Sequence, residues 1–122
     1  MKVTGFSHAS LNIHGTVEET KKFYTEFLGL VEKPRPESLR IPGAWYRAGE
    51  AEIHVIGAEH DGRAGNPIGP HYALYVADLD EAIADLEQAG LKYLKMGSAP
   101  DTQVWFTDPA GNTIELQQDP SS

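Results

Sequence analysis

The sequence predicts an α+β fold made of two βαβββ modules, and two features of its internal repetition lead to this prediction. First, the segments 8–13 (HASLNI) and 71–76 (HYALYV) each open with histidine, alternate like a strand, and precede a helix-like segment and further strand-like runs. Second, a glycine ends each helix-like segment, and an ionisable residue follows that glycine after 25 residues in both halves. We therefore expect a single domain, residues 1–122, with module one at about 1–57, a linker at about 58–69 and module two at about 70–118.

Module one is expected to begin with the strand at 8–13 and to continue with a helix over residues 16–30. Thr16 and Glu19 form a predicted capping box, in which the hydroxyl accepts a backbone N–H and the carboxylate reaches back to the cap. Gly29 suits the left-handed position after the last helical turn. Apolar side chains at helical spacing predict a stripe made of Phe23, Phe27, Leu28 and Leu30. Strand-like runs then follow at 30–34 and, around a glycine turn, at 43–57.

Module two repeats this order. The strand at 71–76 is followed by a helix that begins at Asp78, whose capping box is completed by Glu81, and ends at Gly90. The apolar stripe of this helix consists of Leu79, Ile83 and Leu86. Strand-like runs follow at 91–96 and 102–118. Four glycines and two prolines between residues 57 and 70 indicate the linker, and the last residues are expected to fray.

Composition and charge restrict the partners of the chain. It has 122 residues, no cysteine and a formal net charge of −8, and none of its ten basic residues follows Lys95. A phosphate backbone or an anionic membrane surface would be repelled, so we expect no nucleic acid and no membrane as partners. The start of the chain has no apolar run that resembles a signal peptide. We therefore expect a soluble, cytoplasmic protein that binds a small molecule.

Four ligand-type side chains fall at equivalent positions of the two modules. His8 corresponds to His71 at the start of a module, and His54 corresponds to Glu115 in its last strand. Because side chains alternate across a strand, each of the four lies opposite the apolar set that can pack under a helix. If the two half-sheets curl together, the four side chains line the same cup.

This set of side chains predicts a metal site. A buried carboxylate such as Glu115 needs a partner, and three imidazoles with a divalent cation would provide one. Nitrogen and carboxylate ligands suit Fe, Ni, Zn, Mn or Co better than Mg or Ca. A hydrogen-bonded polar cluster and four unrelated surface residues are the alternatives. His14, next to a helix cap, and His60, in the linker, have no counterpart and are expected to be solvated loop residues.

The paired modules, the histidine that opens each of them, and the closing segment DPAGNTIEL (108–116) together resemble the vicinal oxygen chelate superfamily of glyoxalases, bleomycin-resistance proteins and extradiol dioxygenases. The resemblance covers nearly the whole chain. It implies an open, barrel-like sheet around a divalent metal, with His8, His71 and Glu115 as the ligands. It also implies a homodimer, which in this superfamily sometimes shares the site between chains.

The residue at position 54 separates two functions that the resemblance allows. Glyoxalase I-type enzymes place a fourth ligand there, usually a carboxylate, whereas extradiol dioxygenases place a histidine that moves protons near the metal. His54 therefore favours a dioxygenase-like reaction with this histidine as acid/base, and a glyoxalase I-like lyase or isomerase with His54 as a fourth ligand is the alternative. The chain departs from the extradiol pattern at Trp105, where those enzymes usually have tyrosine.

A non-catalytic, small-molecule-binding protein of the bleomycin-resistance type is the third hypothesis. In that case the cup would hold a cationic or aromatic ligand against Trp45, Tyr75 and Trp105, and the histidines would only be structural. The same three aromatic residues form the substrate pocket that we expect for an enzyme, although each tryptophan also suits the core. The presence of all the ligand-type residues favours the enzyme.

Overall fold

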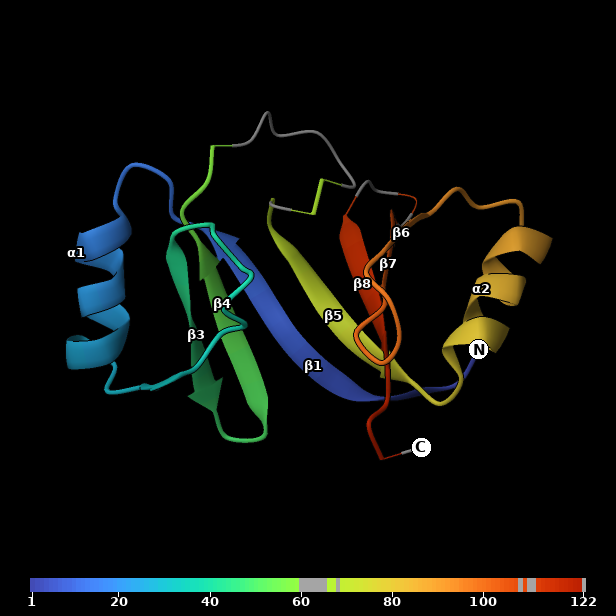
Figure 1. Ribbon diagram of the computed structural model, residues 1–122, viewed down its shortest axis with the longest axis horizontal. Coiled ribbons are helices and arrows are strands. Elements are labelled where there is room, and N and C mark those ends of the chain that lie inside the picture. Colours follow the sequence, from blue (N-terminus) through green and yellow to red (C-terminus); the bar gives the residue numbers. More distant parts are fainter. Residues whose placement is uncertain (60–65, 68, 108, 110–111, 122) are drawn as a thin grey trace.

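The computed structural model describes residues 1–59, 66–67, 69–107, 109 and 112–121, and its strands form one mixed sheet (Figure 1). The sheet has eight strands in the order β2-β3-β4-β1-β5-β8-β7-β6, and it is open, with β2 and β6 at its edges. The strands are β1 (Val3–Asn12), β2 (Val31–Lys33), β3 (Gly43–Ala48), β4 (Ala51–Ile56), β5 (His71–Val76), β6 (Leu94–Met96), β7 (Gln103–Thr107) and β8 (Thr113–Gln118). The predicted α+β fold with an open sheet is confirmed.

The sheet consists of an N-terminal half, β1 to β4, and a C-terminal half, β5 to β8, which are joined by the antiparallel pair β1–β5. In each half the first strand pairs in parallel with the last, and the two remaining strands follow outward. Across the β1–β5 seam, His8 lies opposite Ala73 and Ser10 lies opposite His71. The seam therefore places the first strands of the two predicted modules side by side.

The helices lie at opposite ends of the sheet in Figure 1. The first, α1 (Val17–Lys22), continues directly into a π-helical turn, η1 (Phe23–Phe27), whereas α2 (Leu79–Gln88) is a regular α-helix. The glycines that follow them, Gly29 and Gly90, have φ values of 69° and 72°. Both therefore adopt the left-handed conformation expected after a helix end.

Only the second of the two predicted capping boxes forms its cap bond. Asp78 has an extended backbone, and its carboxylate accepts a hydrogen bond from Glu81 N at 3.1 Å. The prediction for Thr16 is wrong, because its side chain makes no cap bond within the described part of the chain and instead meets Thr20 Oγ1 at 2.9 Å. Its φ of −134° and ψ of 30° differ from the extended backbone that lets a cap side chain reach the first amides of a helix.

The apolar stripe predicted for the first helix does not pack on the sheet. Three of its members are 48%, 76% and 46% exposed, namely Phe23, Phe27 and Leu28. Only Leu30 of the predicted set contacts the core, and Tyr24 packs there instead, stacked on Tyr46 with ring centroids 5.6 Å apart. The cause is the π-helical turn, in which Leu28 N donates to Phe23 O at 3.0 Å, because it interrupts the 3.6-residue period that the prediction assumes.

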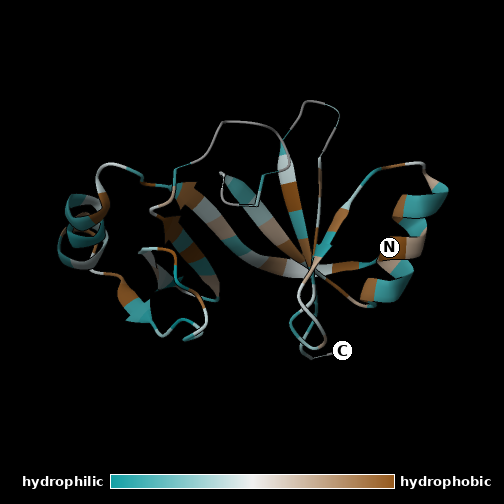
Figure 2. Ribbon diagram, turned by 45° about the horizontal axis from the view of Figure 1, so that its top comes forward, coloured by the Kyte–Doolittle hydropathy of each residue, from teal (hydrophilic) through white to brown (hydrophobic). Residues whose placement is uncertain are grey.

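Two apolar clusters stabilise the fold, one beside each helix. The cluster under α2 contains Val76, Leu79, Ala82, Leu86, Val104, Ile114 and Leu116, and the smaller one near α1 contains Ile13, Ala44, Tyr46 and Val55. Burying one large aliphatic side chain stabilises the fold by about 1.5–3 kcal/mol. Figure 2 shows the hydrophobic residues of α2 on the side of the helix that faces the sheet. Because Ile114 and Leu116 belong to this cluster, Glu115 between them points to the opposite face of β8.

Several predictions fall on segments that lie outside the described residues. They include most of the linker at 58–69 with His60, and part of the closing segment at 108–116. His14 is exposed, as predicted. Among the described residues, no helix is both long enough and apolar enough to span a membrane.

Candidate metal centre

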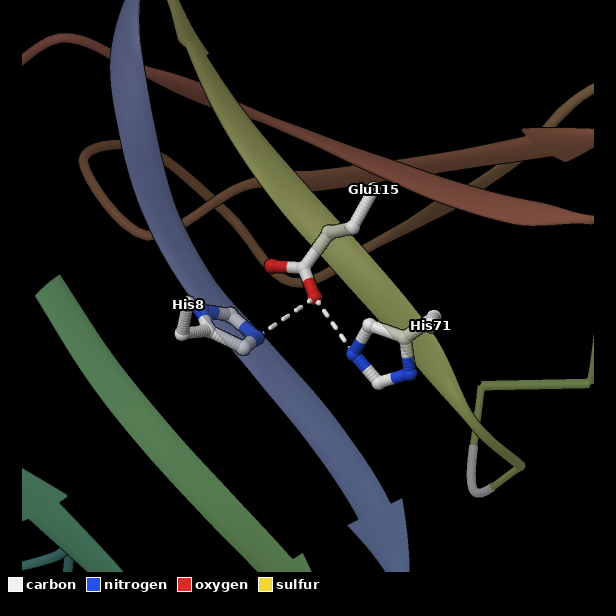
Figure 3. Close-up of side chains that lie close together, drawn as sticks. All are labelled: His8, His71 and Glu115. Atoms are coloured by element: carbon white, nitrogen blue, oxygen red, sulfur yellow. Dashed lines mark ion pairs between the residues drawn. The ribbon is translucent and has the colours of Figure 1, made fainter.

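Three of the four predicted ligand residues meet on one face of the sheet. His8 on β1, His71 on β5 and Glu115 on β8 point toward one another (Figure 3). The Nε2 atoms of His8 and His71 lie 3.3 Å and 3.2 Å from Glu115 Oε1. All three side chains are almost completely buried, with exposed fractions of 4%, 2% and 1%. We call these three residues the triad.

A small residue allows the triad to converge. Ala73 lies between two of its members in the sheet, opposite His8 on β1 and opposite Glu115 on β8. Its side chain is fully buried, and a methyl group leaves room for two longer side chains to meet above it. Alternation along β5 then places His71, two residues away, on the same face. The sheet register therefore brings the triad together without any loop residue.

The separations within the triad fit a divalent ion. The three ligand atoms lie within 4.8 Å of one another. Ligands about 2.1 Å from a common ion, at tetrahedral or octahedral angles, are about 3.0–3.4 Å apart, and both Nε2–Oε1 distances fall in this interval. Without metal, each contact is a hydrogen bond that needs a proton on Nε2, and a metal ion takes the place of that proton.

The other ring nitrogen of each triad histidine has a partner that favours metal binding through Nε2. His71 Nδ1 lies 2.9 Å from the carbonyl oxygen of Gly69. A carbonyl can only accept a hydrogen bond, so Nδ1 carries a proton, and when a metal ion replaces the proton on Nε2 the ring is neutral and offers the lone pair of Nε2 to the ion. Such a partner also fixes the ring orientation.

For His8 the same result comes through a chain of hydrogen bonds. Gln117 Nε2 donates to Glu115 Oε2, because a carboxylate oxygen can only accept. Gln117 Oε1 must then accept from the Ser7 hydroxyl, at 3.4 Å, and Ser7 Oγ is left to accept from His8 Nδ1, at 3.0 Å. Gln117 therefore orients the carboxylate of the triad and keeps a proton on His8 Nδ1, which leaves Nε2 as the atom that would bind a metal ion.

The sequence analysis did not single out Ser7 or Gln117 as partners of the triad, although alternation along β8 places Gln117 on the face of Glu115. Regular alternation puts Ser7 on the face of the sheet opposite His8. In the structure the register of β1 shifts between Phe6 and His8, so that Ser7 is an extra residue and its side chain reaches His8. The sequence carries no signal for this bulge.

The electrostatics of the triad suit a cation. Burial alone would raise the pKa of Glu115, but hydrogen bonds from His71 and His8 outweigh it and hold this pKa at about 2. The carboxylate is therefore ionised at neutral pH. A buried negative charge that faces two imidazoles is ready to receive a divalent ion.

His54, the fourth predicted ligand, lies against the triad but does not join its converging atoms. Its ring stacks on His8, with centroids 3.8 Å apart, and on Trp45, at 4.2 Å. Its Nε2 lies 2.9 Å from Glu52 Oε1, and Glu52 also forms an ion pair with Lys33. Burial and the charge of His8 lower the pKa of His54 to about 4, so the ring is neutral at neutral pH.

The two tryptophans predicted for the pocket border this arrangement. Trp45 pairs with His54 across β3 and β4, and Trp105 pairs with Glu115 across β7 and β8. Trp105 is 5% exposed, and its ring stands at 80° to the ring of His71, 4.6 Å away. Its Nε1 is buried and has no hydrogen-bond partner within the described residues. Tyr75, on β5, is half-buried.

Comparisons with known proteins concern the family and the fold of the chain. A family model described as the Glyoxalase/Bleomycin resistance protein/Dioxygenase superfamily matches residues 5–116. "Glyoxylase I 4" from Arabidopsis thaliana is 29% identical over 125 residues, which cover 95% of this chain and 71% of that protein.

Two solved structures show the same fold at low sequence identity. Methylmalonyl-CoA epimerase from Mycobacterium tuberculosis has a TM-score of 0.69 and 20% identity, and the match covers 98% of this chain and 91% of that one. The 2,3-dioxygenase LapB from Pseudomonas sp. KL28 has a TM-score of 0.71 and 24% identity, and the match covers 98% of this chain and 42% of that one. At these identities the likeness concerns the fold alone.

Proposed function

The chain belongs to the Glyoxalase/Bleomycin resistance protein/Dioxygenase superfamily, and from this we propose that it is a divalent-metal-dependent enzyme acting on a small substrate that chelates the metal through two vicinal oxygens. The observation that carries the proposal is the convergence of His8 Nε2, His71 Nε2 and Glu115 Oε1 in a buried site. Two imidazoles and one carboxylate form a ligand set that leaves positions open for a bidentate substrate.

The triad would hold Fe, Ni, Zn, Mn or Co, because its ligands are nitrogen and carboxylate oxygen. A bound ion would supply Lewis acidity, which stabilises negative charge on the substrate oxygens. Ser7, Gln117 and the carbonyl of Gly69 keep the three ligands oriented before the ion arrives. Trp45 and Trp105, on either side of the triad, and Tyr75 are proposed to form the walls of the substrate pocket.

We assign the acid/base role to His54. Its Nε2–H is donated to Glu52, so its lone pair is on Nδ1. Because the pKa of His54 is lowered to about 4, Nδ1 is free to accept a proton from a substrate at neutral pH. A histidine in this role, rather than a fourth ligand, supports a dioxygenase-like reaction.

A glyoxalase I-like lyase or isomerase is the second proposal, and the relative named "Glyoxylase I 4" favours it because the match spans 95% of this chain. If this chain is such a lyase or isomerase, His54 would be a fourth metal ligand. The third alternative is a protein that binds a small molecule without catalysis, and a test must distinguish it from the two enzymes.

We also propose a homodimer. The edge strands β2 and β6 expose apolar side chains, with Val31 at 66%, Leu94 at 47% and Met96 at 42%. Exposed edges of this kind favour pairing with a second copy. The charge of −8 supports a protein without nucleic-acid or membrane partners, and a cytoplasmic location fits the same picture.

The test is anaerobic reconstitution of the metal-free chain with Fe²⁺, Ni²⁺, Zn²⁺, Mn²⁺ and Co²⁺, followed by assays with catechols and with a thiol–aldehyde adduct. Ring cleavage of a catechol with Fe²⁺ would support the dioxygenase, and turnover of the adduct with Ni²⁺ or Zn²⁺ would support the lyase or isomerase. Glu115→Gln is the control in every assay. Metal far below one equivalent, with no activity gained on reconstitution, would contradict both enzymes and favour the binding protein.

A further inference from the structure

We propose that Glu52, supported by Lys33, is a positioning residue that keeps His54 out of the metal's coordination sphere and so holds the number of protein ligands at three. The inference rests on the proposed metal-binding function of the triad. It assigns to Glu52 and Lys33 a role in choosing between a three-ligand and a four-ligand centre.

The backbone gives His54 the same access to the centre that it gives Glu115. Each of the two residues pairs with a tryptophan in the preceding strand of its half. Each also lies opposite a small residue in the first strand, which is Ser10 for His54 and Ala73 for Glu115. His54 is already in contact with a triad ring, 3.8 Å from His8 between centroids. The direction of its ring nitrogens, and not its place in the sheet, therefore separates it from the converging ligand atoms.

Glu52 sets that direction. It lies two residues from His54 on the same face of β4, and its Oε1 accepts the Nε2–H bond at 2.9 Å. Its Oε2 forms an ion pair with Lys33, which reaches over from the edge strand β2. Both oxygens of Glu52 are thus engaged, and the lysine neutralises a carboxylate that would otherwise be available to a cation. The stacked rings of Trp45 and His8 hold the imidazole on its two faces.

The C-terminal half has a different pair at the equivalent positions. Thr113, two residues before Glu115, corresponds to Glu52, and Leu94, opposite Trp105, corresponds to Lys33. A threonine is too short to capture a side chain two residues away as Glu52 does, and a leucine carries no charge. Glu115 consequently turns to the imidazoles of the triad, whereas His54 turns to Glu52.

The number of protein ligands determines how many coordination positions on the ion remain open for a substrate. A six-coordinate ion held by three protein ligands keeps three positions, which admit a bidentate substrate and one further small molecule. A fourth protein ligand leaves only two. Glu52 thereby determines whether a second reactant can share the ion with a chelating substrate.

The experiment counts the histidine ligands in the Co²⁺-loaded chain by proton NMR, in which each metal-bound imidazole gives one strongly shifted, solvent-exchangeable N–H signal. We expect two signals for the wild type and three for Glu52→Ala, whose apparent Co²⁺ affinity should rise by about tenfold, the scale on which partners of metal ligands act. Glu52→Ala combined with His54→Ala should return to two signals.

Two control variants complete the design. Glu52→Gln keeps an acceptor for His54 Nε2–H and should show two signals, which makes it the folded reference if Glu52→Ala is poorly stable. Glu32→Ala removes an exposed carboxylate from the edge strand β2, next to Lys33, and it should also show two signals with unchanged affinity. Two signals and unchanged affinity in Glu52→Ala, or three signals in the wild type, would overturn the inference alone. Failure of the wild type to bind Co²⁺ would overturn the proposed function and the inference with it.

Discussion

His54 in the N-terminal half and Glu115 in the C-terminal half occupy equivalent positions, each paired with a tryptophan and each in the strand beside the seam strand of its half. Glu115 contacts the Nε2 atoms of two histidines, whereas His54 is bonded to Glu52 and stacked between two rings. The repeated backbone therefore determines where a side chain can reach. The two side chains nevertheless bind different partners, and we infer that Glu52 causes the difference.

The helices of the two halves also occupy equivalent positions but differ in their contacts. Both are followed by a left-handed glycine, but α2 is capped by Asp78 and buries Leu79, Ala82 and Leu86, whereas α1 has no side-chain cap and buries none of its own residues. We infer that α2 contributes more to the stability of the fold than α1. Substitutions at matched positions of the two halves, and a change of pH, test this comparison.

The largest effect is expected at the triad. Glu115→Gln should abolish tight metal binding while the fold is kept, because a neutral amide is a poor ligand and removes the charge that balances the ion. The loss in affinity should exceed the roughly 10–100-fold that follows removal of a partner of a metal ligand. Metal content per chain after dialysis, with exposed His14→Gln as control, measures it. Equal metal content in the wild type and Glu115→Gln would refute the site.

The second prediction separates two histidines that sit in neighbouring parts of the sheet. His71→Ala should lose metal and activity together, because its Nε2 belongs to the triad. His54→Ala should keep most of its metal affinity and lose about 10²–10⁴-fold in turnover, the usual range for a general acid or base. Metal titration and steady-state kinetics of both variants decide the matter. A His54→Ala chain as empty as His71→Ala would identify His54 as a ligand.

The third prediction compares the helices through one apolar residue of each half. Leu86, on α2, is 3% exposed, and Leu86→Ala should lower the free energy of unfolding by about 2–5 kcal/mol. Phe27, on η1, is 76% exposed, and Phe27→Ala should change it by no more than about 0.5 kcal/mol. Denaturant unfolding of the metal-free chains gives both values. A loss for Phe27→Ala as large as that for Leu86→Ala would show that this face is buried in solution.

The fourth prediction concerns pH. The pKa of His54 is lowered from 6.5 to about 4 by burial and the charge of His8, against the opposing effect of Glu52 and Glu115, so the unfolded chain binds more protons in this interval. The stability of the metal-free chain should therefore fall as pH decreases from 6.5 to 4. His54→Gln should remove this part of the decline. Unfolding curves with the same slope against pH in both chains would contradict it.

The smallest effect is expected at the helix caps. Asp78→Ala should cost about 0.5–2 kcal/mol, because the amide of Glu81 loses its acceptor. Thr16→Ala should cost less, since Thr16 makes no cap bond. Thermal or denaturant unfolding of the two variants provides the comparison, and a greater loss for Thr16→Ala would reverse it.

The architecture was accessible from the sequence because its signals are local and repeated. Alternation in the strands, the glycine after each helix and the equal spacing in the two halves predict the order of helices and strands along the chain and place His8, His71 and Glu115 on the face opposite the apolar side chains. Ala73, on β5 between the strands that carry His8 and Glu115, is the small residue that lets these side chains meet.

The departures arise where the backbone leaves its regular period. The bulge at Ser7 adds one residue to β1, and the π-helical turn at Phe23–Phe27 adds one residue to a helical turn. No residue type in either segment predicts these changes. The partners of His54 were not predictable, because its ring stacks on Trp45 and His8 and its bonding partner Glu52 pairs with Lys33, and these residues meet only through the register of the sheet.

The triad straddles the β1–β5 seam, since His8 comes from one half and His71 and Glu115 come from the other. A bound ion would therefore link the two halves of the sheet. At a concentration one hundred times its Kd, it would add about 2.7 kcal/mol to the free energy of unfolding. If the chain were cut between its halves, neither fragment would hold the full ligand set. Reassembly of the two fragments would then depend on the ion, and the seam would become a metal-controlled switch for fragment complementation.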